Sequence, residues 1–429
     1  MEAEMKMCRS ILNKPLFRVL FCVYGSGSLV GEGLRGHNCQ KRRRRMAKDM
    51  FHVGTQVLIG KERFSGIFDG MTKVLIVTDK FMHESGTVSY VTDVLDHLKV
   101  EWKIFSEVRP DPDIMTVSKG VAMILEFQPQ AVVALGGGSS IDAAKAIVYF
   151  AAKESNAPRC KFVAIPTTSG TGSEMTNFAV ISNPEKAAKY PLVNDDLYPD
   201  IAVLDAELVK TVPPAITAAT GMDVFTHAVE AFVCTEANHF TDACAEKAMK
   251  LVRSYLLRCY KNPEDMEARQ GMHDASCLAG IAFTNAGLGL VHGMAHTFGA
   301  HFHVPHGKAN AILLPYVMGF NAGCYDSQLT DVAKKYARIS RLLRIEGPGI
   351  RQSAFSLIRT MRQYNTRLGI PATIKELGIS KEEFESVLDE MCKAAKADNC
   401  TSTNPRECTP EDIRKIFLQA YDGKIGTGR

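Results

Sequence analysis

The stretch QAVVALGGGSSIDAAKAIVYFAA (residues 130–152) joins an apolar run, three consecutive glycines and a segment of helix-forming residues. The apolar run predicts a buried strand, and the segment after the glycines predicts a helix. Glycines let the backbone approach a ligand closely, and the start of a helix offers unpaired N–H groups to an anion. The pattern therefore predicts a strand–loop–helix unit that binds a pyrophosphate. It differs from the GxGxxG fingerprint, however, and a tight structural turn would have the same sequence.

Polar side chains in and near this stretch are candidate contacts for such a ligand. Ser139 can add a hydroxyl contact, and Asp142 can bind a ribose or hold the loop. Asp79 ends the apolar run KVLIVTD (73–79), where an acid can accept hydrogen bonds from an adenosine ribose and repel a 2′-phosphate. This position favours NAD over NADP, although a helix N-cap is the alternative role. The loop IPTTSGTGSEMTNF (165–178) carries six hydroxyl side chains and fits hydrogen bonding to a polar cofactor.

Further apolar runs alternate with helical segments only in the first half of the chain. The expected strands include 53–59, 73–79, 100–108, 162–168 and 200–205, and helices are expected at 91–98 and 117–127; residues 130–152 are expected to form a strand, a glycine loop and a helix. After VPPAI (212–216) the periodicity is helical to about residue 420. Parallel strands with intervening helices form α/β domains. We therefore expect an α/β N-terminal dinucleotide-binding domain at 46–210 and an all-α C-terminal domain at 211–429.

The composition excludes several classes of protein. A length of 429 residues exceeds what one core usually supports, so two domains are expected. The net charge of +4 arises from residues 1–45, which carry +7, so the remainder is mildly acidic and gives no reason to expect nucleic-acid binding. No apolar run is long enough to span a membrane. The 12 cysteines form no C-x-x-C pair, which favours free thiols in a reducing cytoplasm.

Residues 1–45 differ from the rest of the chain. An apolar segment leads into a glycine-rich one and then into KRRRR (41–45). Three interpretations stay open: a targeting or encapsulation arm, a transit-like segment, or an extension upstream of a true start at Met46.

Carboxylate and imidazole side chains in the second half form a candidate metal site. In GMDVFTHAVEAF (221–232), Asp223 and His227 are four residues apart and share one helix face among apolar neighbours. A mutual hydrogen bond or a shared divalent metal would satisfy both. The stretch GLGLVHGMAHTFGAHFHVPHGKAN (287–310) adds five histidines. Spacing alone does not show which of them meet Asp223.

Within that histidine-rich stretch, His292 and His296 are four residues apart and would share a face. A zinc-protease motif would need glutamate where the chain has Gly293, so that hydrolase class is excluded. His306 lies between Pro305 and a glycine, in a turn.

Several of these segments together resemble a known family. GGGSSIDAAKAI, AIPTTSGTGSE, GMDVFTHAVEAF, the histidine-rich stretch and NPRECTPEDI follow one another as in the iron-containing (group III) alcohol dehydrogenase family. The resemblance covers about residues 51–422. The run KYPLVNDDLYPDIAVLD (189–205) is most similar to 1-propanol dehydrogenases associated with bacterial microcompartments. Residues 1–45 have no counterpart, and the link from the glycine loop to FVAIPTT is shorter than in many members.

The resemblance implies roles for individual residues. It implies four metal ligands, Asp223, His227, His292 and His306. It implies cofactor contacts at Asp79, Gly137, Gly138, Ser139, Asp142, Thr167, Thr168, Ser173 and Lys189. His296 matches a histidine near the nicotinamide and is the candidate catalytic proton relay, whereas His301 and His303 match no functional position. Phe178 and Phe283 match substrate-pocket positions; lactaldehyde reductases have asparagine at the position of Phe178, so phenylalanine favours an unsubstituted aldehyde.

The implied activity is hydride transfer between NAD(H) and a short-chain aldehyde or primary alcohol, of the propanal/1-propanol or acetaldehyde/ethanol class. The cofactors would be NAD(H) and one divalent metal, ferrous iron or else zinc, acting as a Lewis acid. We expect a homo-oligomer, a dimer or larger, in the cytoplasm or inside a microcompartment with shell or enzyme partners, and no nucleic-acid or membrane partner.

Three other functions are alternatives to this one. A lactaldehyde/1,2-propanediol oxidoreductase would have a more polar pocket. A dehydroquinate-synthase-like lyase that uses NAD would need several basic residues for its substrate, and the histidine-rich stretch has only Lys308. A non-enzymatic assembly protein would explain residues 1–45 but not the polar residues among apolar neighbours.

Overall fold

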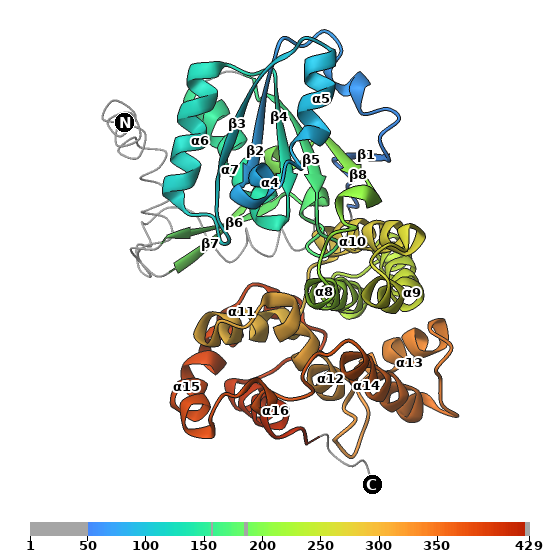
Figure 1. Cartoon of the computed structure of the whole chain (residues 1–429). Coiled ribbons are helices and arrows are strands. Elements are labelled where there is room, and N and C mark those ends of the chain that lie inside the picture. The colour runs from blue at the N-terminus through green and yellow to red at the C-terminus, as the bar shows by residue number, and fades with distance from the viewer. Residues whose placement is uncertain (1–49, 156–157, 184–187, 425–429) are drawn as a thin grey trace. The chain divides into compact units, whose positions relative to one another are not determined.

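The computed structural model describes residues 50–155, 158–183 and 188–424 (Figure 1). The chain divides into two compact units. Among the described residues, the first comprises Val53–Thr168 and Ser173–Leu208, and the second comprises Ser169–Gly172, residues 50–52 and the chain from Val209 onward. Residues 1–45, for which three interpretations were left open above, lie outside the described residues.

The first unit is built on a six-stranded parallel sheet with the order β1-β8-β5-β4-β2-β3. Its strands are β1 (Gln56–Ile59), β2 (Lys73–Asp79), β3 (Glu101–Val108), β4 (Ala131–Gly136), β5 (Lys161–Pro166) and β8 (Ile201–Leu204). The α-helices are α4 (Lys80–Glu84), α5 (Ser89–His97), α6 (Ile114–Phe127) and α7 (Gly138–Ser155). Short 3-10 turns are η1 (Ser65–Phe68), η2 (Ser173–Met175), η4 (Asp195–Leu197) and η5 (Ala206–Leu208).

Both faces of this sheet are covered, as the continuous apolar strands require. Successive side chains of a strand point to opposite faces. Leu75, Val77, Val132 and Ala134 accordingly join a core with α6 and α7, whereas Val74, Ile76, Val133 and Leu135 join a second core with α5. All six residues of β4 are buried in the sheet. The glycine turn therefore lies at the carboxyl end of a central strand.

An antiparallel hairpin of β6 (Phe178–Asn183) and β7 (Ala188–Val193) also belongs to the first unit. The sequence analysis assigned no strands to it. Ser182 extends the pairing by forming a bridge to Asp113, and its backbone N–H donates to the carbonyl of Pro112 at 2.9 Å.

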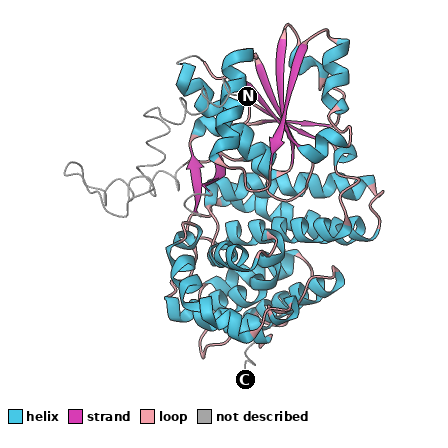
Figure 2. Ribbon diagram, turned by 60° about the vertical axis from the view of Figure 1, so that its left-hand side comes forward, coloured by secondary structure: helices cyan, strands magenta, loops and turns pink. Residues whose placement is uncertain are grey.

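The second unit is helical throughout its described residues (Figure 2). Its α-helices are α8 (Pro214–Val233), α9 (His239–Lys261), α10 (Met266–Ala286), α11 (Leu290–Phe302), α12 (His306–Ala322), α13 (Val332–Leu342), α14 (Ile350–Arg367), α15 (Lys381–Ala397) and α16 (Pro410–Asp422), and its 3-10 turns are η6 (Lys375–Leu377) and η7 (Cys400–Thr403). The predicted combination of an α/β domain and an all-α domain is confirmed.

Helix α8 forms the centre of the second unit. It packs against α9, α10 and α12, and it is buried on every side over most of its length. Helices that are apolar all round belong in a core, so the few polar side chains of α8 lie among apolar groups. This placement decides the electrostatics of the candidate site.

The described helices include no single membrane-spanning candidate. No single one is both long and apolar enough to cross a bilayer, and one pair, α10 and α11, passes on length and composition only when taken together across a 107° bend.

Candidate metal centre and cofactor loops

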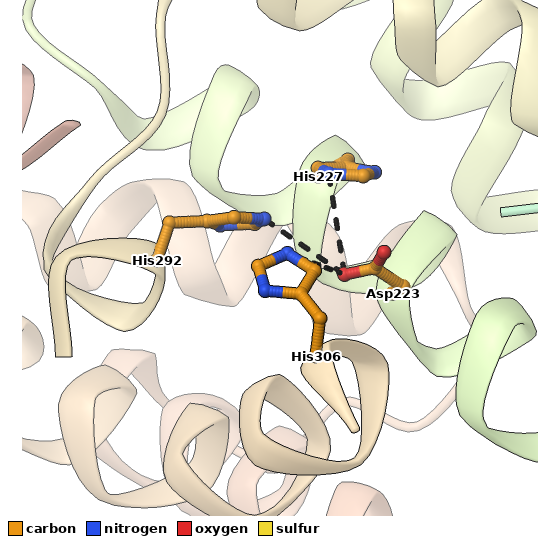
Figure 3. Close-up of side chains that lie close together, drawn as sticks. All are labelled: Asp223, His227, His292 and His306. Atoms are coloured by element: carbon orange, nitrogen blue, oxygen red, sulfur yellow. Dashed lines mark ion pairs between the residues drawn. The ribbon is translucent and has the colours of Figure 1, made fainter. Parts of the chain in front are cut away.

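Four side chains of the second unit converge on a single point (Figure 3). Each of Asp223, His227, His292 and His306 offers a ligand atom that lies within 4.8 Å of the others. The Nε2 atoms of His227, His292 and His306 lie 4.0, 3.8 and 3.7 Å from Asp223 Oδ1. Ligand atoms about 2.0–2.2 Å from a shared ion lie at about this spacing from one another.

Three helices bring these four residues together. Asp223 and His227 lie one turn apart on α8, His292 lies in the first turn of α11, and His306 is the first residue of α12. Gly307 allows the start of α12 to approach α8, because a Cβ at that position would collide with the carbonyl oxygen of Ala219. The spacing of Asp223 and His227 was readable in the sequence, whereas the meeting of α8, α11 and α12 is a property of the fold.

Burial sets the charge of this cluster. The side chains of Asp223, His227 and His292 are at most 6% exposed, whereas that of His306 is 42% exposed. Burial lowers the pKa of His227 despite the neighbouring carboxylate. Burial together with three neighbouring histidines holds the pKa of His292 well below its usual value. Neutral imidazoles are the metal-binding form, and a buried carboxylate requires a compensating cation or donor, so the donor set fits a divalent cation.

Glu230 supports this cluster from behind His292. One carboxylate oxygen lies 2.6 Å from His292 Nδ1, and the other accepts the backbone N–H of Val291 at 2.7 Å. A carboxylate on Nδ1 fixes the imidazole with Nε2 toward the ion. Gly289 leaves room for this arrangement, because a Cβ there would lie 2.7 Å from Glu230 Oε1. Burial raises the pKa of Glu230 to about 8.

Asn310 is a second supporting residue, one turn after His306 on α12. Its side-chain nitrogen donates to Asp223 Oδ1 at 2.7 Å and lies 3.1 Å from the Nε2 atoms of His292 and His306. The sequence analysis missed both Glu230 and Asn310. The available signal was the same for each, a polar residue at helical spacing from a predicted ligand within an otherwise apolar helix.

His296 stands beside the four-residue cluster without joining it. Its Nδ1 lies 2.9 Å from Asp398 Oδ2, and its ring stacks on that of His306 with centroids 5.3 Å apart. Burial acts to raise the pKa of Asp398, but the hydrogen bond and charge of His296 bring it below its usual value. His296, Asp398 and Cys400 form a second group of metal-ligating residue types. The sequence analysis did not identify Asp398.

The remaining histidines of the stretch lie apart from this cluster. His301 Nε2 lies 3.9 Å from Glu390, and His303 ends α11 with a left-handed backbone.

In the first unit, the predicted cofactor residues gather where β2, β4 and β5 end. Asp79 accepts the backbone N–H of Met82 as the N-cap of α4, and its other oxygen accepts the hydroxyl of Ser140 at 3.4 Å. The backbone N–H of Thr167 donates to the carbonyl of Gly136 at 3.0 Å. The end of β2, the glycine turn and the start of the hydroxyl-rich loop therefore lie together at the carboxyl-terminal ends of the strands.

Four more of the predicted cofactor residues also lie here. Gly137 precedes α7, Gly138 and Ser139 begin it, and the side chain of Thr168 lies 3.5 Å from where a Cβ on Gly137 would stand.

The last three predicted cofactor residues make contacts within the protein or lie in the hairpin; they are Asp142, Ser173 and Lys189. Asp142 accepts the hydroxyl of Ser173 at 2.6 Å and the backbone N–H of Val180 at 3.0 Å. These contacts correspond to the loop-holding alternative for Asp142. Lys189 lies in β7, paired with Ser182.

The two predicted pocket residues belong to different units. Phe178 begins β6 in the first unit. Phe283 lies on α10 in the second, where its ring centroid is 4.6 Å from that of His227.

A parallel α/β unit and a helical unit with one carboxylate and three imidazoles fit a metal-dependent enzyme that uses a dinucleotide. Comparison with known proteins specifies the class further. Residues 55–206 match the model described as "Iron-containing alcohol dehydrogenase", and residues 217–421 match "Fe-containing alcohol dehydrogenase family, C-terminal". The chain belongs to the iron-containing alcohol dehydrogenase family.

Relatives and solved structures agree with this assignment. The chain is 45% identical over 347 residues to 1-propanol dehydrogenase PduQ of Salmonella typhimurium, covering 80% of this chain and 92% of the relative. It is 40% identical over 368 residues to an NADPH-dependent butanol dehydrogenase of Clostridium saccharobutylicum, covering 82% and 92%. An iron-containing alcohol dehydrogenase from Thermococcus thioreducens superposes with a TM-score of 0.79 at 34% identity, covering 87% of this chain and 100% of that one.

These matches confirm the predicted enzyme class. The chain is an iron-type alcohol dehydrogenase, an oxidoreductase of aldehydes and alcohols.

Proposed function

We propose that this enzyme interconverts short, unsubstituted aldehydes and primary alcohols at a ferrous ion held by Asp223, His227, His292 and His306. The observation that carries the proposal is the convergence of these four donors in the helical unit. Three nitrogens and one carboxylate oxygen suit ferrous iron and zinc alike, and the iron-containing family models favour iron. A divalent cation bound there supplies Lewis acidity toward a carbonyl oxygen.

The protein residues around this centre have separate tasks in the proposal. Glu230 orients His292, and Asn310 orients Asp223. His296 is the candidate proton relay to the alcohol oxygen, with Asp398 holding its Nδ1 so that Nε2 exchanges the proton. The hydroxyl-rich loop and the glycine turn bind the cofactor phosphates, and α7 presents its N-terminus to them.

An apolar pocket residue supports the choice of substrate. Phe283, whose ring centroid lies 4.6 Å from that of His227 in the helical unit, offers no hydrogen bond to a second hydroxyl group on the substrate, which favours propanal or butanal over lactaldehyde. Two relatives carry the names of 1-propanol and butanol dehydrogenases. We also propose a homo-oligomer that works in the cytoplasm or within a bacterial microcompartment; the likeness of residues 189–205 to microcompartment-associated enzymes supports the second location.

Metal removal tests the proposed function directly. A strong chelator under anaerobic conditions should abolish NADH oxidation with propanal, and ferrous iron should restore it by about 10³-fold, because several kcal/mol of transition-state stabilisation return with the ion. Zinc added to a parallel sample measures metal preference, and lactaldehyde measures substrate preference. Full activity in the chelated protein would contradict the proposal.

Asp79 should set the preference for NADH over NADPH. Replacement by serine removes the carboxylate that repels a 2′-phosphate but keeps a side chain that can cap α4. We expect the ratio of kcat/KM for NADPH to that for NADH to rise by about 10-fold, which corresponds to about 1.4 kcal/mol. Asp113→Ser is the matched control, because Asp113 caps α6 in the same way. An unchanged ratio in Asp79→Ser would mean that this carboxylate does not face the ribose.

A further inference from the structure

A lysine is buried beneath the hydroxyl-rich loop of the first unit. Lys145 lies on α7 and is 1% exposed. Its ammonium donates to Ser173 Oγ at 3.1 Å, Thr176 Oγ1 at 2.7 Å and the carbonyl of Phe178 at 2.7 Å. An ammonium has three N–H donors, and each of them is used by one six-residue segment, 173–178.

The same segment is held through a second residue of α7. Asp142 lies one turn before Lys145, and it accepts the hydroxyl of Ser173 at 2.6 Å and the backbone N–H of Val180 at 3.0 Å. Ser173 thus donates to Asp142 and accepts from Lys145, so its hydroxyl lies between the two charged groups. Lys145, Asp142 and Ser173 form a buried anchor that joins α7 to the loop and to the start of β6.

Stability alone does not explain a charge at this position. Burying an ammonium carries a desolvation cost, and an apolar side chain of similar volume often serves a core equally well. Burial does lower the pKa of Lys145, to about 8, against the opposing effects of Asp142 and Glu174. An apolar side chain, however, cannot form hydrogen bonds to two hydroxyls and a carbonyl. The Lys145 ammonium forms all three, and these bonds fix the shape of the loop.

We propose that Lys145 is a positioning residue for NADH, fixing segment 173–178 against α7 so that the glycine turn, the hydroxyl-rich loop and Phe178 keep one arrangement. The proposal rests on the proposed function, in which these segments bind the cofactor and substrate. Asp142 and Ser173 then act through the anchor and do not contact the cofactor themselves. The ligand class is a nicotinamide dinucleotide, and Lys145 touches no part of it.

Lys145→Met tests this proposal in the full-length protein. Methionine keeps the length and removes the three donors. Hydrogen exchange of residues 167–180 measures the loop without cofactor, and NADH fluorescence titration of the protein without aldehyde measures affinity. We expect faster exchange in 173–178 and an NADH Kd and KM raised by about 10- to 100-fold, because NADH binding must then order a loosened loop. Bound metal should stay unchanged, because all four proposed ligands lie in the other unit.

Lys153→Met is the matched control. Lys153 lies on the same helix, two turns later, and its side chain is 46% exposed with Asp196 as its partner at 3.4 Å. Its replacement removes the same charge from α7 and should change neither the exchange of 173–178 nor the affinity for NADH.

The double variant Lys145→Met/Ser173→Ala separates an anchor from direct contacts. If Ser173 acts only through the anchor, its removal should weaken NADH binding no further than about 2-fold beyond Lys145→Met. A larger additional loss would show that Ser173 contacts the cofactor and would contradict this part of the proposal.

Other outcomes would overturn the role of Lys145 itself. Unchanged NADH affinity in folded Lys145→Met would do so, and so would weaker binding without faster loop exchange. If that variant does not fold, Thr176→Val removes one of the three acceptors of the Lys145 ammonium. Faster exchange with weaker NADH binding in this variant supports the anchor, and no change contradicts it. Failure of the wild-type protein to bind NADH would contradict the proposed function instead, while the exchange rates would still report on the anchor.

Discussion

Replacing His306 by alanine should remove the bound metal and lower kcat/KM with NADH and propanal by about 10³-fold or more, because the Lewis acid is lost with its ligand. His306 contributes the most exposed of the four donors and lies at the start of α12. Alanine is tolerated at a helix start, so the fold should persist. Metal content by elemental analysis and thermal unfolding of the same preparation measure the two effects separately.

Two other histidines of the same stretch provide the controls. His303→Ala, three residues earlier at the end of α11, should leave metal content and activity unchanged. His296→Ala should keep the metal and lose activity, because its Nδ1 is bound by Asp398 and it lies outside the four-residue cluster. Equal metal loss in His296→Ala and His306→Ala would show that the ligand set has been assigned wrongly.

Glu230→Gln should weaken metal binding by about 10- to 100-fold, the usual effect of removing a partner that orients a ligating histidine. Glutamine has nearly the same volume and can still accept from Val291, but its amide does not provide the carboxylate at His292 Nδ1. Unsatisfied buried groups should also lower the free energy of unfolding by about 1–3 kcal/mol. Competition with a chromophoric chelator measures the affinity, and denaturant unfolding measures the stability.

The pair of Glu390 and His301 is the matched control for Glu230. Its atoms lie 3.9 Å apart, and the carboxylate side chain is 75% exposed. Glu390→Gln should therefore alter neither metal affinity nor stability. A metal affinity for Glu230→Gln equal to that of the wild type would show that His292 needs no partner to present Nε2.

Local patterns predicted the fold and part of the site. Continuous apolar runs indicated the buried parallel strands, and the three glycines before α7 marked the turn at the end of β4. Asp223 and His227 were readable as a pair because helical spacing is a local property. The joining of His292 and His306 to that pair came from family resemblance, since no spacing rule connects residues on three different helices.

The residues that were missed make contacts over long sequence distances. Glu230 meets His292 across 62 positions, and Asp398 meets His296 across 102. Lys145 would be placed on a solvent face by composition alone, and only the tertiary fold shows that it is buried beneath residues 173–178. The hairpin β6–β7 was also missed.

The four proposed ligands all belong to the helical unit, and they join positions 83 residues apart along the chain. An ion that ties Asp223 on α8 to His306 on α12 acts as a reversible cross-link, and any ligand that binds only the native state stabilises it by mass action. Iron supply would then govern how long the enzyme survives proteolysis as well as how fast it turns over. Loss of the ion should therefore lower the free energy of unfolding as well as the activity.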